Sequence, residues 1–401
     1  MKLTEHLEMN IGLFSESYLP QVDGVVTALR NLRDGLCRKG HSVYIFTISH
    51  PGATPEDGVF RFRSVRTPFD PGHRLALHPS IKRIKAIAEL NLDIVHTQDL
   101  FTMGNLGARV SEILKVPQVH TFNSNYFVLA DYLGIARSFG KLYARHKIRA
   151  FCNKQRRVIA PSKKARDILL DCGVSQPIEI IAHGADLEPF RNTQPDFCQS
   201  IRSFRENHGI AEDDSVILSL GRIAKEKQPL VIVDNFISVL KVFPKAILLF
   251  VGDGPQRKKV EKYVSRQGVG NRVRFVGTLD YPNSVAVAYR ASDVFVSTSV
   301  TEIFSFSVLE AIASGLPVVA AKDPCLEERV VEGKNGFFFD DPHELWRGLN
   351  KILGDQNLKK NMSRFSVEIS RLYDLSHYVD KITGAYTLSV IGPGDSFYTS
   401  Q

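Results

Sequence analysis

The chain of 401 residues is too long for one ordinary domain, and its composition, 43% hydrophobic and 23% charged, is that of a globular protein that can bury a large core in each of two domains. Its net charge of +8 is concentrated in residues 1–190, which carry 25 Lys and Arg against 18 Asp and Glu. The first residues lack the apolar core of a secretory signal, and no apolar run reaches about 20 residues, so we expect a cytoplasmic protein without a membrane span.

The first half of the chain alternates short apolar segments with helical ones. Residues 9–17 form a predicted strand, and residues 25–40 carry apolar side chains at helical spacing before Gly40 ends the helix. One more helix is predicted at 104–115, and further strands at 41–48, 92–100, 115–123, 156–162 and 178–186. This alternation predicts a parallel, doubly wound sheet.

The same pattern starts again near residue 215. Strands are predicted at 215–222, 246–255, 273–279, 293–299, 316–322 and 335–340, and helices at 228–243, 256–267, 306–315 and 342–353. The polar, proline-containing segment 188–200 is interpreted as a linker. We therefore predict two Rossmann-like α/β domains, at 1–195 and 196–375, with residues 376–401 packing near or crossing back to the first. Ligands of such sheets bind at the carboxyl ends of the strands.

The five cysteines are scattered, odd in number and without C-x-x-C spacing. This usage is typical of structural thiols in a reducing compartment. It predicts neither a disulfide framework nor a metal site.

Two glutamates that follow a predicted strand give the sharpest chemical signal. Glu302 falls in a loop above the sheet, and Glu310 early in the next helix. The amides of Ser305, Phe306 and Ser307 would be first-turn donors, which suit a diphosphate or sugar hydroxyls. Two Glu at this spacing also flank many ordinary amphipathic helices. Their position between a strand end and the string EAIASGLPVV favours a binding role.

A second signal is the string GRIAKEKQP. Gly221 permits a tight turn after a strand, and Arg222 and Lys227 follow it. Two cations at the mouth of a sheet can neutralise a diphosphate and stabilise it as it leaves. The alternative is a solvated basic loop. The glycines of VGDGP, after the next strand, fit either a close backbone approach or a plain turn.

In the first half, Gly24 begins the first helix, whose positive end could face phosphates. A plain Asp-Gly turn is the alternative. His120 and His96 each end a strand, and His120 is the better candidate for catalysis. The chain contains no G-x-G-x-x-G string, which argues against a nicotinamide site.

The series of motifs, from Asn10 to about Leu372, resembles glycosyltransferase family 4. The matching strings come in family order: SESYLPQVDGVV, LDIVHTQD, VHTF, VIAPSKKARDIL, AHGADLEPF, LSLGRIAKEKQP, LLFVGDGP, VRFVGTL, SVTEIFSFSVLEAIASGLPVVA and EGKNGFFFDD. The resemblance implies the GT-B fold, with two domains facing a cleft. It also implies sugar transfer from a nucleotide-sugar donor with retention of configuration and without a metal or other cofactor.

The resemblance also implies roles for individual residues. Arg222 and Lys227 match the pair that contacts the donor diphosphate, and Glu310 matches the glutamate that binds the ribose. Glu302 matches the glutamate that holds the transferred sugar. His120 matches a histidine near the reacting centre, and Gly24 matches the glycine loop near the phosphate. Gly221 is a further candidate for donor binding. We therefore expect His120, Glu302, Arg222 and Lys227 to be catalytic.

Three residues depart from the family pattern. Ser305 stands where Gly is usual, and its side chain could hinder the close approach of the donor to this turn. Gln98 replaces a frequent second His, and Gln228 stands where Gly is commoner.

The strings SESYLPQVDGVV and HTFNSNY most resemble the lipid-glycosylating branch, which includes diacylglycerol glucosyltransferases. That branch implies UDP-glucose as donor, with GDP-mannose as the alternative. It also implies a lipid acceptor and peripheral association with the cytoplasmic face of a membrane.

A basic stretch supports a membrane surface as partner. Residues 132–166 hold eleven Lys and Arg and no Asp or Glu, with interleaved Leu142, Tyr143, Ile148 and Phe151. A solvated basic helix is the alternative, and no nucleic-acid module is found. The membrane or acceptor candidates are Phe69, Leu75, Arg137, Lys141, Arg145 and Arg149.

The sequence thus predicts a retaining hexosyltransferase that acts on a lipid acceptor such as diacylglycerol. A GDP-mannose-dependent mannosyltransferase and a nucleotide-sugar epimerase of the same fold are the alternatives. A non-enzymatic lipid-surface scaffold is disfavoured by the charged residues at the predicted donor site.

Overall fold

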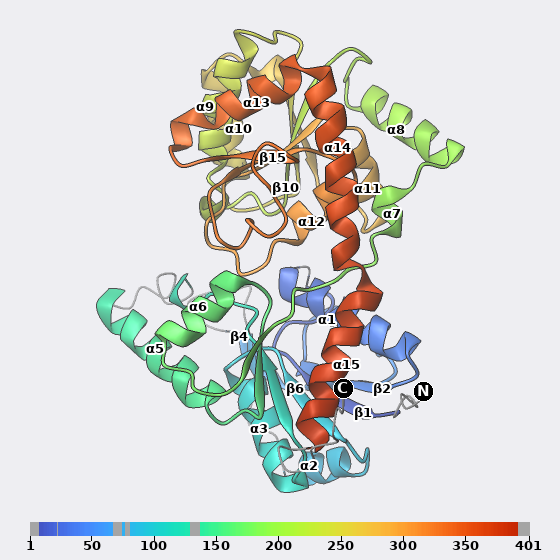
Figure 1. The fold of residues 1–401 in the computed structure, drawn as a ribbon, viewed down its shortest axis with the longest axis vertical. Coiled ribbons are helices and arrows are strands. Elements are labelled where there is room, and N and C mark those ends of the chain that lie inside the picture. Colours follow the sequence, from blue (N-terminus) through green and yellow to red (C-terminus); the bar gives the residue numbers. More distant parts are fainter. Residues whose placement is uncertain (1–7, 22, 67–73, 77–80, 129–136, 392–401) are drawn as a thin grey trace, which may run out of the picture. The chain divides into compact units, whose positions relative to one another are not determined.

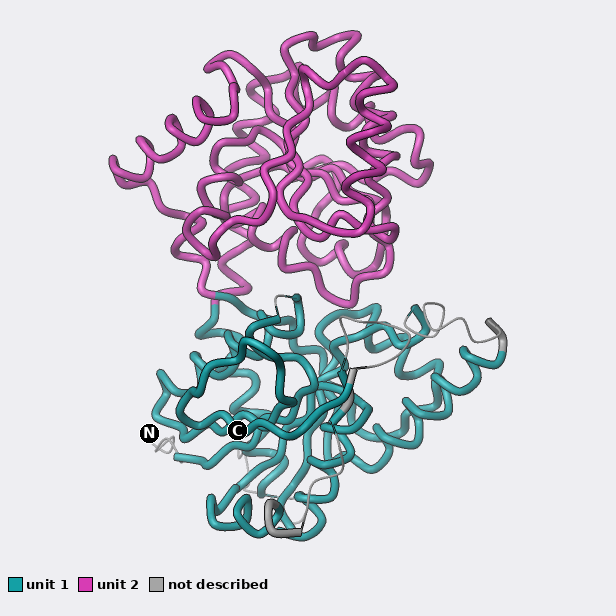
Figure 2. The backbone as a smooth tube through the Cα atoms, turned by 180° about the vertical axis from the view of Figure 1, so that it is seen from behind, with its two compact units in different colours: residues 1–185, 375–401 teal, residues 186–374 magenta. Residues whose placement is uncertain are grey.

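A computed structural model describes residues 8–21, 23–66, 74–76, 81–128 and 137–391. The chain forms two compact units, coloured separately in Figure 2. Unit 1 consists of residues 1–185 and 375–401, and unit 2 of residues 186–374. The first unit ends earlier than the predicted boundary at 195, and the chain returns to it at Leu375.

The predicted linker at 188–200 is wrong, because this segment is largely helical. Helix α7 (Glu188–Arg191) and helix α8 (Pro195–Asn207) each carry a proline in the first turn. Proline is well tolerated there because its missing N–H has no intrahelical partner. Phe190 is fully buried, and α7 packs on helices of unit 2. The prolines therefore mark helix starts and not a flexible connection.

Unit 1 is built on a parallel sheet of seven strands in the order β3-β2-β1-β6-β7-β8-β9. Figure 1 labels β1, β2 and β6 of this sheet. Its strands are β1 (Asn10–Phe14), β2 (Ser42–Ile48), β3 (Val59–Phe62), β6 (Ile94–Thr97), β7 (Gln118–Thr121), β8 (Arg157–Ala160) and β9 (Ile178–Ile180). A separate antiparallel pair joins β4 (Ser64–Arg66) to β5 (Arg74–Ala76). The central strands are buried on both faces, as their continuous apolar sequences require.

The helices of unit 1 are α1 (Gly24–Arg38), α2 (Ile81–Ala88), α3 (Thr102–Leu114), α5 (Arg137–Cys152), α6 (Lys163–Asp171) and α15 (Leu375–Ile391). The last helix of the chain, α15, packs on the first, α1. Gly35 permits this approach, because a Cβ at that position would lie 2.3 Å from a methyl carbon of Val379. The apolar side of α15 thus completes the core of unit 1.

Unit 2 repeats the architecture with six parallel strands in the order β12-β11-β10-β13-β14-β15. The strands are β10 (Val216–Leu220), β11 (Ile247–Val251), β12 (Val273–Gly277), β13 (Val294–Ser297), β14 (Val318–Ala321) and β15 (Gly336–Phe339). Besides α7 and α8, the helices are α9 (Pro229–Leu240), α10 (Arg257–Arg266), α11 (Asn283–Arg290), α12 (Phe306–Ala313), α13 (Leu345–Gly354) and α14 (Gln356–Ser370). Both sheets confirm the predicted doubly wound α/β class.

Within the described ranges, no helix is both long enough and apolar enough to cross a bilayer.

Candidate functional site

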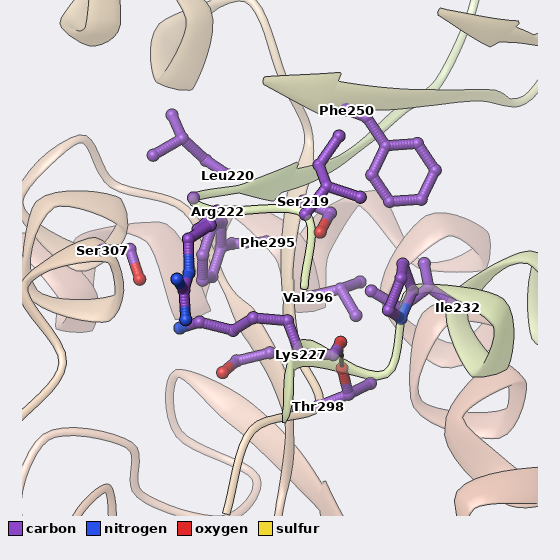
Figure 3. Close-up of a pocket in the computed structure, with 14 residues that line it drawn as sticks. Ser219, Leu220, Arg222, Lys227, Ile232, Phe250, Phe295, Val296, Thr298 and Ser307 are labelled. Atoms are coloured by element: carbon purple, nitrogen blue, oxygen red, sulfur yellow. Dashed lines mark hydrogen bonds between the residues drawn. The ribbon is translucent and has the colours of Figure 1, made fainter. Parts of the chain in front are cut away.

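A pocket lies in unit 2 at the carboxyl ends of β10 and β13, which are neighbours in the sheet although β11 and β12 separate them in sequence. The connections after these two strands leave in opposite directions, which opens a crevice at this edge. Figure 3 shows the side chains of Arg222 and Lys227 extending from the chain after β10 along this pocket. The pocket is lined by Ser219, Leu220, Gly221, Arg222, Ile223, Lys227, Pro229, Ile232, Phe250, Phe295, Val296, Ser297, Thr298 and Ser307.

The loop that carries Arg222 is held by the glycines of the VGDGP string. A Cβ on Gly252 would lie 2.1 Å from the carbonyl oxygen of Gly221, and a Cβ on Gly254 would lie 2.5 Å from that of Ile223. The Gly221 amide donates to the Val251 carbonyl at 2.9 Å. Gly221 itself has a φ of 135°, which only glycine adopts readily. The glycines of VGDGP therefore allow two loops of the protein to approach each other closely.

Both predicted cations form ion pairs. The Lys227 Nζ lies 2.5 Å from the Glu302 Oε1, and the Ser299 hydroxyl donates to the same oxygen at 3.2 Å. Arg222 lies 2.7 Å from the Glu226 carboxylate, four residues further along the chain. The structure thus brings Arg222, Lys227 and Glu302 together at one edge of the sheet. The cations are balanced by carboxylates before any anion binds.

Gln228 and Thr298 join the two loops behind Lys227. The Gln228 side-chain amide donates to the Thr298 carbonyl at 3.1 Å, and the Thr298 hydroxyl donates to the Lys227 carbonyl. Gln228 has a φ of 43°, in the left-handed region that favours glycine. This backbone explains why Gly is commoner at the position. The polar role of Thr298 was not predicted, and only its place at a strand end could have indicated it.

Helix α12 begins beside the pocket. Ser305 caps it with an extended backbone, at a φ of −108°, and its side chain makes no hydrogen bond to the helix amides. The Ser305 hydroxyl instead lies 3.1 Å from that of Ser307, which lines the pocket. Because this φ is negative, a side chain fits where the family usually has Gly. Phe306, the first helical residue, is buried and not part of the pocket lining.

Glu310 lies one helical turn beyond Ser307 and is 5% exposed. The Tyr289 hydroxyl lies 3.0 Å from its Oε2 and 3.0 Å from the Ser307 carbonyl. Burial raises the pKa of the Glu310 carboxyl to about 7, although hydrogen bonds from Tyr289 and Tyr281 oppose this shift. The spacing of residues in the sequence does not predict these tyrosine partners, because Tyr289 lies on the preceding helix, α11, and Tyr281 lies in the segment just before that helix.

His120 lies at the end of β7 in unit 1, with its ring fully buried. Its Nδ1 lies 3.0 Å from the Thr97 hydroxyl and 3.0 Å from the Thr97 carbonyl, whereas its Nε2 has no hydrogen-bond partner in the described chain. Burial lowers the pKa of His120 to about 3, so the imidazole is neutral at pH 7. The Nε2 is thus a buried polar atom without a partner among the described residues.

His96 differs from His120 because both of its ring nitrogens are engaged. They lie 2.6 Å from the Tyr386 hydroxyl and 2.7 Å from the Thr121 hydroxyl. These bonds connect β6 to helix α15 and give His96 a structural role. Gly24 begins α1, where the Asp23 side chain accepts from the Val26 amide at 2.9 Å.

Helix α5 separates the apolar residues of the basic stretch into two groups. Ile148 and Phe151 are buried in unit 1, whereas Phe139, Leu142 and Tyr143 are 68%, 64% and 52% exposed. The exposed residues are three and four positions apart, so they form one stripe on the helix. Lys141, Arg145 and Arg149 are exposed on the same helix. Arg145 donates to the Asp171 carbonyl.

Of the other membrane candidates, Leu75 lies in β5 and Arg137 begins α5, whereas Phe69 lies outside the described residues. Among the residues with described positions, no group of three or more His, Cys, Asp or Glu is arranged to hold a metal ion.

Comparison with known proteins matches both units to glycosyltransferase families. Residues 22–189 match the family described as Glycosyltransferase Family 4, and residues 200–367 match Glycosyl transferases group 1. The chain is 32% identical over 346 residues to the alpha-monoglucosyldiacylglycerol synthase of Streptococcus pneumoniae, an alignment covering 84% of this chain and 76% of that protein. It is 30% identical over 374 residues to the protein of the same name from Acholeplasma laidlawii, covering 90% and 92%.

Solved structures support the fold. The complex of Anabaena HepE with UDP-glucose matches with a TM-score of 0.75 at 20% identity, over 95% of this chain and 100% of that chain. This likeness confirms the GT-B class for the two doubly wound units.

Proposed function

Because the chain belongs to glycosyltransferase family 4, we propose that it transfers glucose from UDP-glucose to a lipid acceptor such as diacylglycerol, with retention of configuration. One observation carries the donor site: Arg222, Lys227 and Glu302 meet at the edge of the sheet where β10 and β13 diverge. In this proposal unit 2 binds the donor and unit 1 the acceptor.

On binding, the diphosphate of the donor would replace Glu302 as the partner of Lys227 and Glu226 as the partner of Arg222. Lys227 and Glu302 are 28% and 25% exposed, and partly exposed pairs of this kind contribute little free energy. A diphosphate with two negative charges is a stronger partner for Lys227 and Arg222 than single carboxylates are. When Lys227 turns to the diphosphate, Glu302 becomes free to accept hydroxyls of the glucose.

The remaining donor contacts would come from α12 and the loop before it. Ser305, Phe306 and Ser307 provide the first amides of the helix, whose positive end favours a negatively charged group. Glu310 lies one turn further along and would accept the two ribose hydroxyls. Gly221 allows the backbone to approach the phosphates without a side chain between them.

In the transfer step the acceptor oxygen would form a bond to the anomeric carbon while the bond from that carbon to the diphosphate breaks. The acceptor proton would pass to the leaving diphosphate on the same face of the sugar, so no carboxylate nucleophile is needed. Arg222 and Lys227 would stabilise the growing charge on the diphosphate. His120 would contact the sugar through its unpartnered Nε2, and Gly24 would place a helix N-terminus near the phosphates.

The lipid acceptor is proposed from the named relatives and from helix α5. The stripe of Phe139, Leu142 and Tyr143 is apolar and exposed, and Lys141 and Arg145 adjoin it. An exposed apolar stripe flanked by cations can insert its side chains at the interface of an anionic bilayer. These features support the proposal that the protein associates peripherally with the cytoplasmic face of a membrane, where it would reach diacylglycerol.

A donor panel tests the activity directly. The protein is incubated with UDP-glucose, GDP-mannose and other nucleotide sugars in the presence of diacylglycerol vesicles, and the product lipid is identified by mass spectrometry. Glucosyldiacylglycerol formed from UDP-glucose alone supports the proposal. A mannosylated lipid formed from GDP-mannose would support the alternative donor, and conversion of the nucleotide sugar without any acceptor would identify an epimerase.

Vesicle sedimentation tests the membrane surface. Leu142→Ser together with Lys141→Glu is expected to reduce sedimentation with anionic vesicles by about tenfold, because an exposed apolar side chain and a cation are removed together. The matched control is Lys258→Glu, at an exposed lysine on α10 in unit 2, which changes the net charge by the same amount. Equal losses in both variants would show attraction by net charge and no contribution from α5.

A further inference from the structure

A second groove lies in unit 2 at the opposite end of the sheet from the donor pocket. It is lined by Arg290, Ser292, Asp293, Ser314, Gly315, Leu316, Pro317, Lys359, Lys360, Ser363 and Arg364. Strand β13 begins directly after Asp293 in the groove and ends with Ser297 in the donor pocket. The four residues of this strand span roughly 13 Å. The groove is therefore a separate site.

The groove carries an excess of positive charge. Four of its residues are cationic, namely Arg290, Lys359, Lys360 and Arg364, against the single carboxylate of Asp293. Lys359 Nζ lies 2.7 Å from Asp293 Oδ1 and neutralises it. Lys360 and Arg364 are exposed and one turn apart on α14, and Lys360 has no ion-pair partner in the described chain. Three cations therefore remain for a ligand.

The floor of the groove holds polar groups without partners. Ser314 is 3% exposed, and its hydroxyl makes no hydrogen bond to any described residue. The buried Nε of Arg290 is likewise unpartnered, while its Nη1 donates to the Ser314 carbonyl at 3.1 Å. A buried hydroxyl without a partner is costly, and Ser314 belongs to the lining of the groove.

The backbone at the floor is also arranged closely against α14. Gly315 has a φ of 78°, and a Cβ at this position would lie 2.9 Å from the Ser363 hydroxyl. Glycine thus lets the loop after α12 approach Ser363. Ser314 and Ser363 thus come from neighbouring elements, and both belong to the lining of the groove.

We propose that this groove binds a phosphate group. Arg290, Lys360 and Arg364 would balance its charge, and the Ser314 and Ser363 hydroxyls would donate to its oxygens. The group could belong to a soluble phosphate compound or to the headgroup of a phospholipid, since both present the same oxygens.

The test measures binding of inorganic phosphate to the whole protein by calorimetry and by thermal melting, against sodium chloride of equal ionic strength. Phosphate is expected to raise the melting temperature of the wild type and of Lys227→Ala, in which the donor site is weakened. Adding Lys360→Glu with Arg364→Glu to Lys227→Ala is expected to abolish this effect. Ser314→Ala keeps every charge and should weaken phosphate binding about tenfold, because it removes one hydrogen bond to a charged group.

The donor-site variant Lys227→Ala serves as the control, because phosphate could also bind there. It should bind phosphate at the groove as the wild type does. Phosphate binding that is lost in Lys227→Ala, or kept when Lys360→Glu and Arg364→Glu are added to Lys227→Ala, would overturn the proposal. If that variant melts early in chloride, Lys360→Gln with Arg364→Gln replaces it.

A second arm distinguishes the two sources once phosphate binding has been measured. The variant Leu142→Ser, in which the α5 stripe is weakened, is sedimented with phosphatidylcholine vesicles containing phosphatidic acid, with and without the groove substitutions. Sedimentation that depends on Lys360 and Arg364 assigns the phosphate to a lipid headgroup. Sedimentation independent of both assigns it to a soluble compound.

Discussion

The ammonium of Lys227 and the carboxylate of Glu302 form an ion pair, with 2.5 Å between nitrogen and oxygen, across the point where β10 and β13 diverge. The two residues are 75 positions apart in sequence. Each follows a different strand, so the parallel sheet alone brings them together. In the absence of donor the two charges neutralise each other. In the proposed complex Lys227 would contact the diphosphate, and Glu302 would accept hydroxyls of the sugar.

Lys227→Ala is expected to lower kcat about a hundredfold or more, because it removes a cation from the leaving diphosphate. The free energy of unfolding should change by less than about 1 kcal/mol, since the ion pair is partly exposed. Steady-state kinetics and denaturant unfolding measure the two effects. Lys245→Ala breaks a surface ion pair with Asp213 and provides the matched control. An unchanged kcat in Lys227→Ala would contradict the assignment.

The stability of the protein should fall as the pH rises from about 4.5 to about 7, through the titration of Glu310. Burial raises the pKa of this carboxyl in the folded chain to about 7 from 4.5, so the folded chain keeps a proton that the unfolded chain has released. The lost stability is about 3 kcal/mol at most. Glu310→Gln should flatten this part of the profile. A profile identical to that of the wild type would show that Glu310 ionises normally.

Affinity for UDP-glucose should change in the opposite direction. An ionised Glu310 accepts hydroxyls better than a protonated one, so binding should tighten between about pH 6 and pH 8. The diphosphate of UDP-glucose is a diester without a proton to lose in this range, which leaves the protein as the source of the change. Glu310→Gln should bind UDP-glucose weakly with little dependence on pH. Calorimetric titration at several pH values measures both.

The sheet was predictable because buried parallel strands are short, apolar and nearly continuous. Val216–Leu220 and Ile247–Val251 need no tertiary information to be recognised. The edge strand Val59–Phe62 was not predicted, since only Phe62 of its four residues is buried. Cations and carboxylates at strand ends could also be predicted, because the carboxyl ends of parallel strands share one edge.

Side-chain surroundings were not predictable from the sequence. The buried and the exposed apolar residues of α5 differ only in the side of the helix on which they lie. The basic residues between them obscure the helical spacing of the apolar residues in the sequence. The two tyrosines that contact Glu310 come from helix α11 and from the segment just before it. The segment 188–200 was wrongly predicted to be a linker because proline is common both in loops and in the first turn of helices.

Gln228→Gly and Gln228→Ala separate backbone strain from hydrogen bonding. Both lose the bond to the Thr298 carbonyl, but only Gly relieves a φ of 43°. The Gly variant should therefore be more stable than the Ala variant by about 1 kcal/mol. Denaturant midpoints at equal slope measure the difference. If the two variants are equally stable, the left-handed backbone of Gln228 carries no strain.

Arg329 is expected to position the donor loop through Phe304. It is 1% exposed, its guanidinium carbon lies 3.9 Å from the centre of the Phe304 ring, and its Nη2 donates to the Cys325 carbonyl at 2.6 Å. Phe304 lies between Glu302 and the start of α12, so its displacement would move both. A desolvated cation over an aromatic ring contributes about 2 kcal/mol.

Arg329→Met keeps the apolar stem and removes the cation, so KM for UDP-glucose should rise about tenfold or more. Arg329→Lys should restore it only in part, because an ammonium keeps the positive charge but lacks the planar surface with which a guanidinium stacks on the ring. Tyr373→Phe is the control: it loses a hydrogen bond to the Glu328 carbonyl but keeps the ring beside Arg329. If Arg329→Met lowers the melting temperature and leaves KM unchanged, Arg329 stabilises the fold without positioning the donor loop.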